Sequence, residues 1–328
     1  MFQQILVPLD GSARAEEALP LAAHLAHRTG GTLFLFCAVP YAYATNAGAL
    51  AVEIHDSLLQ EAQAYLEQAS QMDLLAHLPL RTGILSEPPV QGILSYAQSE
   101  HIDLIVMCSH GYTGLKRWAL GSVAQKVARY SAVPVVILPE QEQPSPLYHP
   151  EVARPLRALA GLDGSSLAEA ALLPTAQLVA LASPPETLGE LHLMRVIKPP
   201  SDPEERMYLK YDIDIREFNY REAEQYLRAT KRSLAQHIPA GLQLQITSSI
   251  VEEADIATAL IKKVETKSNA GTNTYDLMAL ATHGRSGLKR WMIGSVTERV
   301  LEEARFPLLI ARAQVPAATT PSSAETPA

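Results

Sequence analysis

The sequence predicts an α/β protein made of two tandem domains, each built around a parallel β-sheet. Two observations support this fold class. One glycine-rich segment occurs twice, as HGYTGLKRWALGSV at 110–123 and HGRSGLKRWMIGSV at 283–296, and the two copies differ at four positions. Around each segment, short β-branched runs alternate with amphipathic stretches, which is the pattern of βαβ units. At 328 residues the chain is long enough for two such domains.

The similarity between the two halves extends beyond the glycine-rich segment. ILVPLDGS begins at residue 5 and is repeated as ALAGLDGS at residue 158, a shift of 153. DLIVMCSHG at residue 103 is repeated as DLMALATHG at residue 276, a shift of 173. The second copy therefore holds 20 more residues between these points (173 minus 153). We assign them to the polar stretch KSNAGTN at 267–273 and to the region IKPPSDPEERMYLKYDIDI, after the second strand.

The first copy reads as five strands separated by four helices. The runs DLIVM and VPVVIL are apolar without alternation, as expected for strands that helices cover on both faces. Two prolines open the helix of SEPPVQGILSYAQ, in the turn where a missing N–H group costs nothing. We predict strands near 3–9, 32–39, 77–84, 103–109 and 134–138, and helices near 13–28, 52–74, 88–99 and 121–131.

In the second copy, Ser166 and Glu169 have the spacing of a capping box ahead of AALLPTAQLVA, which predicts a helix start. The segment PEQEQPSPLYHPEVARP between the copies is rich in proline and poor in apolar residues, as linkers are. The low-complexity end AQVPAATTPSSAETPA is expected to be disordered. We therefore predict domains at 1–140 and 155–313, a proline-rich linker at 141–154 and a disordered tail at 314–328.

Composition excludes several classes of function. The net charge of −8 and the pI near 5.7 argue against binding to nucleic acid or to an anionic membrane. No apolar run approaches the roughly 20 residues that cross a bilayer, and no signal peptide precedes the first strand. Cys37 and Cys108 lie in apolar runs without metal-ligand spacing, which favours buried free thiols in a reducing compartment. We expect a cytoplasmic protein.

Each glycine-rich segment follows a predicted strand and leads into a helix, at the sheet edge where ligands of α/β proteins bind. Glycines let backbone amides approach an anion, and the first N–H groups of a helix favour phosphate. The alternative is a tight turn before a capped helix. Neither segment matches the Walker A loop or the dinucleotide fingerprint. The candidate phosphate-binding residues are Gly111, Gly114, Gly121 and Ser122 in the first copy, and Gly284, Gly287, Gly294 and Ser295 in the second.

Together these motifs resemble those of the universal stress proteins, in a tandem form with two family domains. The resemblance rests on VPLDGS, on the DLIVMxSHG strand and on the G-x-x-G-x6-G-S loop, and it covers roughly 1–140 and 155–313. It implies a Rossmann-like, five-stranded parallel sheet of order 3-2-1-4-5 in each copy. Strands one and four would then be neighbours. It also implies ATP, with Mg²⁺, as the ligand.

The resemblance gives roles to residues outside the loop. Asp10, after the first strand, would contact the ribose, and Val39, at the end of the second strand, would contact adenine. We take Asp163 and Val196 as their counterparts in the second copy. The alternative for each aspartate is a structural Asp-Gly turn that leads into a helix.

The copies differ around the candidate sites. Pro8 is replaced by Gly161, so the floor of the second pocket is expected to have another shape. The longer loops of the second copy lie after its second strand and before its fourth, where they can cover or reshape a pocket. We expect two competent nucleotide sites, and the alternative is a second copy that accepts another ligand or a partner protein.

The fifth strands, in VPVVIL and FPLLIA, are apolar, and apolar sheet edges invite pairing. Family members commonly dimerise through this strand. We predict that 135–138 pairs with 308–311 inside one chain, so that the tandem copies form an intramolecular pseudo-dimer. A homodimer of whole chains stays open.

Three functions stay open from the sequence. The leading hypothesis is an ATP-binding stress-response protein whose interactions depend on the bound nucleotide. The second is a slow ATPase or autophosphorylating enzyme at the same sites, with Ser122 or Ser295 as acceptor. The third is a nucleotide-free interaction scaffold. We predict no catalytic residues, because His110 and His283 have no nucleophile or paired carboxylate near them in sequence and suit a structural role at the strand end.

Overall fold

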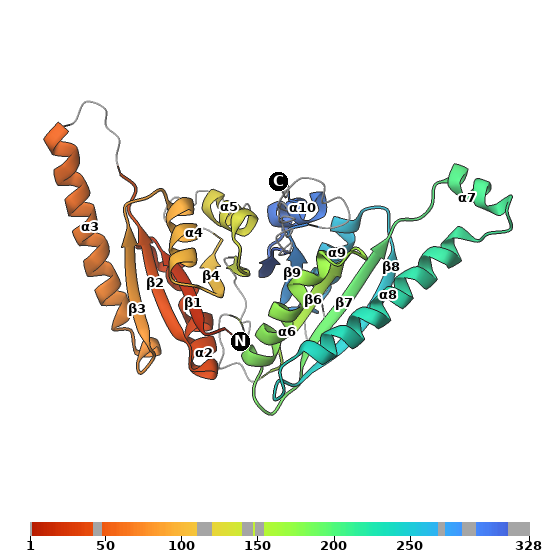
Figure 1. Ribbon diagram of the computed structural model, residues 1–328, viewed down its shortest axis with the longest axis horizontal. Helices are drawn as coiled ribbons and strands as arrows, with labels where there is room; N and C mark the ends of the chain where they lie inside the picture. The colour runs from red at the N-terminus through yellow and green to blue at the C-terminus, as the bar shows by residue number, and fades with distance from the viewer. Residues whose placement is uncertain are drawn as a thin grey trace, which may run out of the picture.

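The computed structural model shows ten strands in one continuous sheet with helices on both faces (Figure 1). It describes residues 2–41, 48–109, 120–139, 147, 154–267, 273–283 and 293–313. From one edge of the sheet to the other, the strands are β3 (Leu80–Leu85), β2 (Thr32–Ala38), β1 (Gln4–Leu9), β4 (Leu104–Cys108), β5 (Val135–Leu138), β10 (Leu308–Ala311), β9 (Leu277–Ala281), β6 (Arg157–Leu162), β7 (Gly189–Ile197) and β8 (Leu244–Glu252).

Within each copy, the strand order is the one that the family resemblance implies. β1 lies between β2 and β4, and β6 lies between β7 and β9. Every pairing inside a copy is parallel. The first and fourth strands of each copy are therefore neighbours, and their carboxyl ends meet at one edge of the sheet.

The two halves of the sheet join through their fifth strands, and the predicted pairing is confirmed. β5 and β10 run antiparallel, with Leu308 opposite Ile137 and Ile310 opposite Val135. All four residues of each strand are buried, so the pairing removes two apolar edges from solvent. The two predicted five-stranded sheets are thus one ten-stranded sheet within a single chain.

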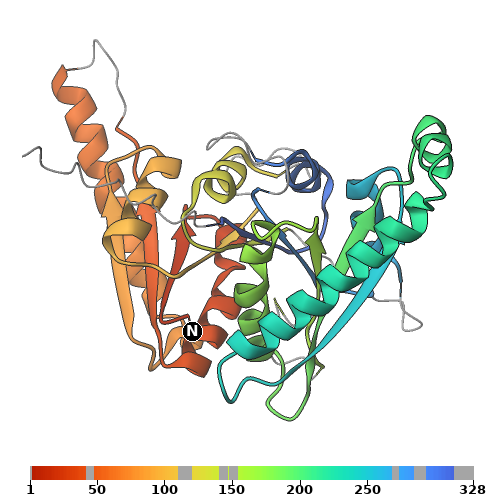
Figure 2. The ribbon, with the colours of Figure 1, turned by 45° about the vertical axis from the view of Figure 1, so that its right-hand side comes forward.

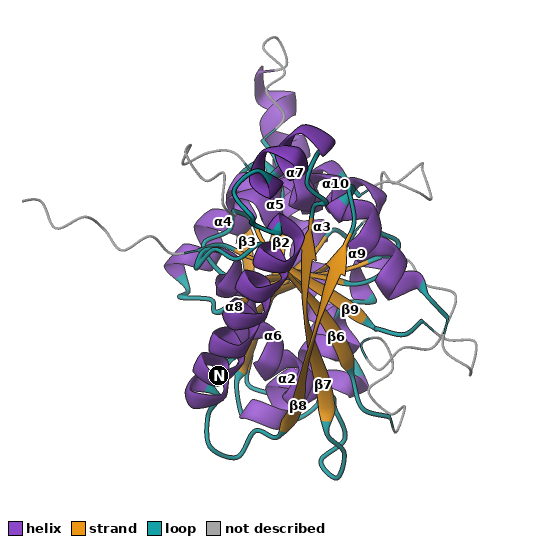
Figure 3. Ribbon diagram, turned by 90° about the vertical axis from the view of Figure 1, so that its right-hand side faces the viewer, coloured by secondary structure: helices purple, strands orange, loops and turns teal. Residues whose placement is uncertain are grey.

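Helices cover both faces of the sheet (Figure 3). Alternate strand residues pack toward one face or the other. One face carries α1 (Ala13–Glu16), α2 (Leu19–Thr29), α3 (Gly48–Ser70), α6 (Leu172–Ala182) and α8 (Ile215–His237). The opposite face carries α4 (Pro89–Ser99), α5 (Ser122–Tyr130), α9 (Ile256–Glu265) and α10 (Ser295–Glu303). The core consequently lies in two apolar layers, one on each side of the sheet.

Helix contacts on both faces add to the strand pairing between the copies. On one face, Arg28 of α2 donates to the carbonyl oxygen of Ser183, after α6, at 3.2 Å. On the other face, Arg129 of α5 forms an ion pair with Glu298 of α10. The copies are therefore held together across the sheet and above both of its faces.

Three helices differ from the sequence prediction. α3 begins and ends four residues before the predicted 52–74. The helix predicted over 13–28 is divided into α1 and α2, because Pro20 lies in the first turn of α2 and has no N–H group to continue α1. Ser166 and Glu169 form no capping box. The Oγ of Ser165 accepts from the amide of Ala168 at 3.2 Å instead, and the short 3₁₀ helix η2 (Ala168–Ala171) precedes α6. A second 3₁₀ helix, η1 (Asp73–Leu75), follows α3.

The first insertion of the second copy forms an extra helix. α7 (Asp202–Leu209) lies in the segment after β7 and begins at a capping box of Ser201 and Glu204. Figure 2 shows α7, in green, and the start of α8 extending beyond the strand ends. The described ends of the other insertion, Lys267 and Asn273, form an isolated antiparallel bridge.

Nearly all of the predicted linker, and the whole predicted tail, lie outside the described residues. At the linker's end, Arg154 makes a bidentate ion pair with the buried carboxylate of Asp276, at 2.9 and 2.5 Å. In the described part of the chain, no helix combines the length and apolar character that crossing a membrane requires.

Candidate functional site

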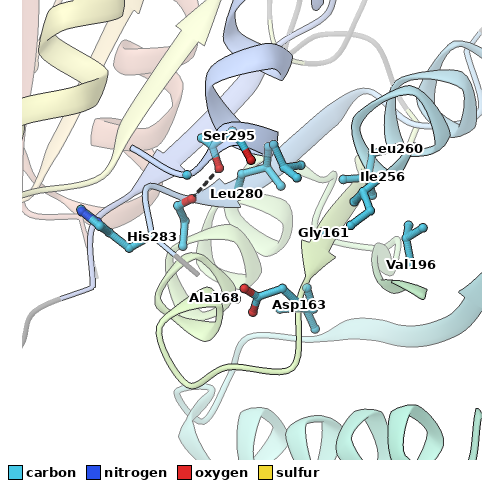
Figure 4. A pocket seen from close by; sticks show the side chains of 14 residues that line it. Gly161, Asp163, Ala168, Val196, Ile256, Leu260, Leu280, His283 and Ser295 are labelled. Atoms are coloured by element: carbon cyan, nitrogen blue, oxygen red, sulfur yellow. Dashed lines mark hydrogen bonds between the residues drawn. The ribbon is translucent and has the colours of Figure 1, made fainter. Parts of the chain in front are cut away.

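A pocket lies at the carboxyl ends of β6, β7 and β9 in the second copy (Figure 4). Its lining includes the side chains of Asp163, Val196, His283 and Ser295. Asp163 and Ser295 lie on opposite sides of the cavity, with Val196 to one side and His283 to the other. Because β6 has β7 and β9 as neighbours, residues far apart in sequence meet here. Four predicted site residues line this one pocket: Asp163, Val196, Gly294 and Ser295.

Each candidate aspartate anchors a turn after the first strand of its copy. Asp163 Oδ1 accepts from the amide and the hydroxyl of Ser165, at 2.9 and 2.6 Å. Asp10 Oδ1 accepts from the same groups of Ser12, at 3.1 and 2.6 Å. The intervening glycine has a φ of 87° in the second copy and 82° in the first, a conformation that favours glycine. The structural Asp-Gly turn therefore exists, and in the second copy it forms part of the pocket wall.

The helix after each glycine-rich segment begins with a glycine N-cap. The amide of Gly294 donates to the carbonyl oxygen of Thr282 at 2.8 Å, and that of Gly121 donates to Ser109 at the same distance. We expected these glycine amides to face a ligand, but the end of the preceding strand occupies them. The donors for an anion are instead the amides of the first helical turn, starting at the serine after each glycine.

Neither N-cap glycine is required by its backbone conformation. Gly294 has φ −64° and ψ 141°, and Gly121 has φ −60° and ψ 145°, which any residue adopts. A Cβ added to Gly294 would meet the carbonyl oxygen of Thr282 at 3.7 Å, an ordinary contact, and no closer atom of the described residues. The described part of the protein would thus accept alanine at this position.

One wall of the pocket is apolar. It is formed by Val196 of β7, Leu260 of α9 and Leu280 of β9. Gly161 lets the two leucines approach, because a Cβ there would lie 2.7 Å from Leu280 Cδ2 and 3.1 Å from Leu260 Cδ1. The first copy has Pro8 at this place, so the floors of the two sites differ in shape.

His283 lines the pocket, although the sequence analysis set it aside. Its Nδ1 lies 2.9 Å from Thr282 Oγ1, and its Nε2 is buried without a hydrogen-bond partner among the described residues. Burial, and then the nearby charge of Arg312, lower the pKa of this imidazole, so the ring is neutral at pH 7. The signal that could have found it is its place directly before the glycines, repeated as His110.

The strand register corrects one pair of predicted counterparts. Pairing with the first strand puts Cys37 and Arg195 at the same position of the two copies. Val196 therefore matches Ala38, one residue before Val39. Val39 packs on the face of α3 and Val196 on the face of α9. The match of Val39 with Val196 is wrong by one residue, because it paired valine with valine by residue type, while the backbone ladder sets the register and matches Val39 with Ile197.

The two sites differ in charge, because the second copy has a buried arginine where the first has a cysteine. Arg195 is 5% exposed, and its guanidinium carbon lies 5.9 Å from the ring centre of Tyr226. The guanidinium also packs on Gly164 of the aspartate turn, 2.9 Å from where a Cβ would be. The first copy has Cys37 here, and burial, with a smaller effect of Asp10, raises the pKa of its thiol to about 11. A positive charge thus lies beside one aspartate turn, and a neutral thiol beside the other.

Some predicted site residues are outside the described part of the chain. These are Gly111, Gly114, Gly284 and Gly287. In the first copy, β1 pairs with β4, so the strand before Asp10 adjoins the strand that leads to the first glycine-rich segment. The described residues contain no group of three or more His, Cys, Asp or Glu side chains arranged to hold a metal ion.

Comparison with known proteins gives one consistent result. The sequence profile of the "Universal stress protein family" matches residues 1–139 and 156–312. The universal stress protein YxiE of Bacillus subtilis is 31% identical over 147 residues, which are 42% of this chain and 99% of that protein. A universal stress protein of Mycolicibacterium smegmatis is 25% identical over 321 residues, 94% of this chain and 96% of its own.

The fold is also found among solved structures. A universal stress protein from Archaeoglobus fulgidus superposes with a TM-score of 0.62 at 18% identity, covering 95% of this chain and 99% of its own. The likeness therefore extends over both copies, and it is a likeness of fold.

Proposed function

Because this chain belongs to the universal stress protein family, we propose that each copy binds an adenine nucleotide and that the bound nucleotide regulates the protein's interactions. The observation that carries the proposal is the second-copy pocket. There, an aspartate turn, an apolar wall and the positive end of a helix meet at the carboxyl edge of a parallel sheet.

In the second copy, Asp163 would accept hydrogen bonds from ribose hydroxyls, while Val196 would pack against the base. The amides at the start of α10, with the hydroxyl of Ser295, would bind phosphate oxygens. ATP would bring its Mg²⁺ with the phosphates. We assign the remaining contacts to Gly284, Gly287 and Gly294, and the corresponding site of the first copy to Asp10, Gly111, Gly114, Gly121 and Ser122, with Ala38 at the place of Val196.

The size of the pocket limits how much of a nucleotide it encloses. Its cavity volume is about 110 Å³, below the roughly 300–1,000 Å³ of sites that bury a drug-sized ligand. The described walls would therefore surround one part of a nucleotide, and the rest would extend from the mouth. Gly294 is part of the pocket lining, and its missing side chain leaves space that the described residues do not fill.

The first test is to count bound nucleotide. Protein purified without added nucleotide is denatured, and released nucleotide is identified and quantified by chromatography. We expect about two adenine nucleotides per chain, or stoichiometric binding when ATP, ADP or cyclic AMP is titrated. No released nucleotide and no binding of any of the three would overturn the proposal. One site per chain would show that the copies have divided their roles.

A second test uses substitutions that the fold tolerates. Gly294→Ala should lower the free energy of unfolding by no more than about 1 kcal/mol, the cost of alanine at an N-cap, and weaken nucleotide binding at the second site at least about tenfold, or 1.4 kcal/mol. Asp163→Asn keeps an oxygen for the Ser165 bonds but removes the charge, whereas Asp163→Ala removes both. Full affinity in Gly294→Ala and both Asp163 variants would contradict the assignment. Mg-ATP turnover, measured in the same proteins, distinguishes a binding protein from a slow ATPase.

A further inference from the structure

A groove with several positive charges lies between α8 and the outer strand β8. Its lining includes Arg228, Lys231 and Arg232 of α8, one carboxylate (Glu224) and Ser248 of β8, and its cavity volume is about 430 Å³. Tyr220, which is 52% exposed, belongs to the same lining about three helical turns earlier. The groove therefore follows the length of the helix, and its size is that of a ligand site.

β8 forms the end of the sheet. Among the described strands it pairs with β7 alone, through all nine of its residues. One edge of its backbone is therefore without a strand partner. Such an edge accepts an extended peptide as an additional strand, unless the protein protects it. α8 packs over β7 and β8, and the groove between α8 and β8 has three residues of this edge strand, Ser248, Ser249 and Ile250, in its lining.

The equivalent helix of the first copy provides an internal comparison. Tyr65 of α3 donates to Glu16 at 2.9 Å, and Tyr226 of α8 lies against Glu169, the matching glutamate of the second copy. Both tyrosines occupy the same position over the sheet, which aligns α3 with α8 at a shift of 161 residues (226 minus 65).

With this alignment, the positive charges of the groove have no counterparts in α3. Arg228, Lys231 and Arg232 match Glu67, Ser70 and Gln71. Arg228 pairs with Glu224 at 2.7 Å, whereas Lys231 and Arg232 form no ion pair with the described residues. The whole chain carries a net charge of −8, so uncompensated positive charge here stands out from an acidic protein.

We propose that this groove binds an acidic segment of a partner protein in an extended conformation, added to the free edge of β8. The partner's backbone would pair with β8, and its carboxylates would face Lys231 and Arg232. The hydroxyl of Ser248 would donate to a further oxygen. The negative charge of the remaining surface repels such a segment elsewhere and so directs it to this face. The proposal does not depend on nucleotide binding.

The test uses the full chain and a fluorescein-labelled peptide of five Glu-Val repeats. As a strand, this peptide puts all its carboxylates on one face. Fluorescence anisotropy at low salt should show saturable binding, and the same peptide with lysine for glutamate should not bind. Binding should weaken as salt rises, because the charges are at the surface. No binding of the acidic peptide at low salt would overturn the proposal.

Charge-reversal variants locate the binding. Lys231→Glu with Arg232→Glu should weaken binding at least about tenfold, which is 1.4 kcal/mol. The matched control, Lys126→Glu with Lys262→Glu, makes the same change of charge on exposed residues of the opposite face and should stay within about twofold. Circular dichroism checks that both proteins are folded. Equal loss in the two variants would mean that net charge alone drives binding, and would overturn the site.

A backbone variant of the peptide tests the added strand. The amides of successive strand residues point to opposite edges, so one peptide is N-methylated at alternate valines and a second at alternate glutamates. Both keep every charge and side chain, and we expect binding at least about tenfold weaker in one of the two. Unchanged binding of both would show that the peptide does not pair with β8.

Discussion

The two copies fill the same place under their second and third strands in opposite ways. In the first copy, Phe34 and Phe36 of β2 pack around Tyr96 of α4, with ring centres 6.3 and 4.7 Å from that of the tyrosine. Tyr96 lies so close to Gly83 of β3 that a Cβ there would be 2.4 Å from the ring. This corner of the first copy is an aromatic cluster.

In the second copy, the same corner is a hydrogen-bonded network. The register puts His192 at the place of Phe34. Its Nδ1 lies 2.7 Å from Thr247 Oγ1, and its Nε2 lies 2.7 Å from Ser249 Oγ. Thr247 in turn donates to Glu190 at 2.8 Å. His192 is 8% exposed, so these partners satisfy a buried ring.

The difference teaches that the backbone ladder fixes where a side chain lies, while the chemistry at that place is free to change. An apolar cluster and a polar network are both stable there, provided that every buried polar atom has a partner. A corner with some residues of each kind would leave buried polar atoms without hydrogen-bond partners. The following experiments therefore exchange residues between the copies.

The largest effect is expected from exchanging the pocket floors. Gly161→Pro puts the residue of the first copy into the second, where a Cβ would lie 2.7 Å from Leu280 Cδ2. Overpacking at this buried position should lower the free energy of unfolding by about 3 kcal/mol, measured by urea denaturation. The reverse change, Pro8→Gly, should cost less than about 1 kcal/mol. An unchanged midpoint for Gly161→Pro would show that the leucines can move aside.

A somewhat smaller effect is expected from His192→Phe. The substitution removes the hydrogen-bond partner that the Ser249 hydroxyl has among the described residues, and one partner of Thr247, and should cost about 2 kcal/mol. Adding Ser249→Gly puts the residue of the first copy, Gly83, at this register position, removes the hydroxyl that lost its partner and should recover part of the loss. If the double variant is less stable than the single one, the two corners are not interchangeable.

The pH dependence of the free energy of unfolding also tests the difference between the two corners. Burial lowers the pKa of His192, and it also lowers that of His24. Such a histidine stabilises the fold above its unfolded pKa, near 6.5, and this contribution is lost as the pH falls through that value toward the folded pKa. The free energy of unfolding should therefore fall between about pH 7 and pH 5, and fall less in His192→Phe. His24 is common to both proteins, so parallel curves would exclude a contribution from His192.

The smallest effect is expected where the copies touch through charge. Arg129 and Glu298 are 29% and 44% exposed, so solvent screens their ion pair strongly. A double-mutant cycle with alanine should give a coupling energy of about 0.5 kcal/mol. A coupling above about 2 kcal/mol would mean that this pair, and not the strand joint alone, holds the copies together.

Much of the fold could be predicted because repetition and apolar runs determine it. Strand order and the antiparallel joint of β5 with β10 follow from local pattern or from the family resemblance. The place of the extra residues was predicted only in part. The shift between the copies is 153 at the first strand (159 minus 6) and 158 at the second (192 minus 34), so five of the 20 extra residues lie between β6 and β7. The capping of α6 and the match of Val39 could not be predicted, because residue type does not tell adjacent serines apart or fix the strand register until hydrogen bonds select one arrangement.

The site was harder to predict where charged or polar side chains are buried. Arg195 reads as a surface residue in an apolar strand, and only its packing on Tyr226 and Gly164 shows it as buried. His192, Thr247 and Ser249 read as polar residues of an exposed edge, since their mutual bonds cross between strands. Contacts between segments distant in sequence determine which polar side chains are buried, and the pattern of a single sequence does not show those contacts.

Because β5 and β10 belong to one chain, the pairing of the two copies does not depend on protein concentration. Separate subunits would associate in proportion to their abundance, and duplicates that diverge would form mixtures of like and unlike pairs. One polypeptide fixes the ratio at one to one and gives the strands an effective concentration that dilution does not change. The two halves can consequently specialise without ever losing, or exchanging, their partner.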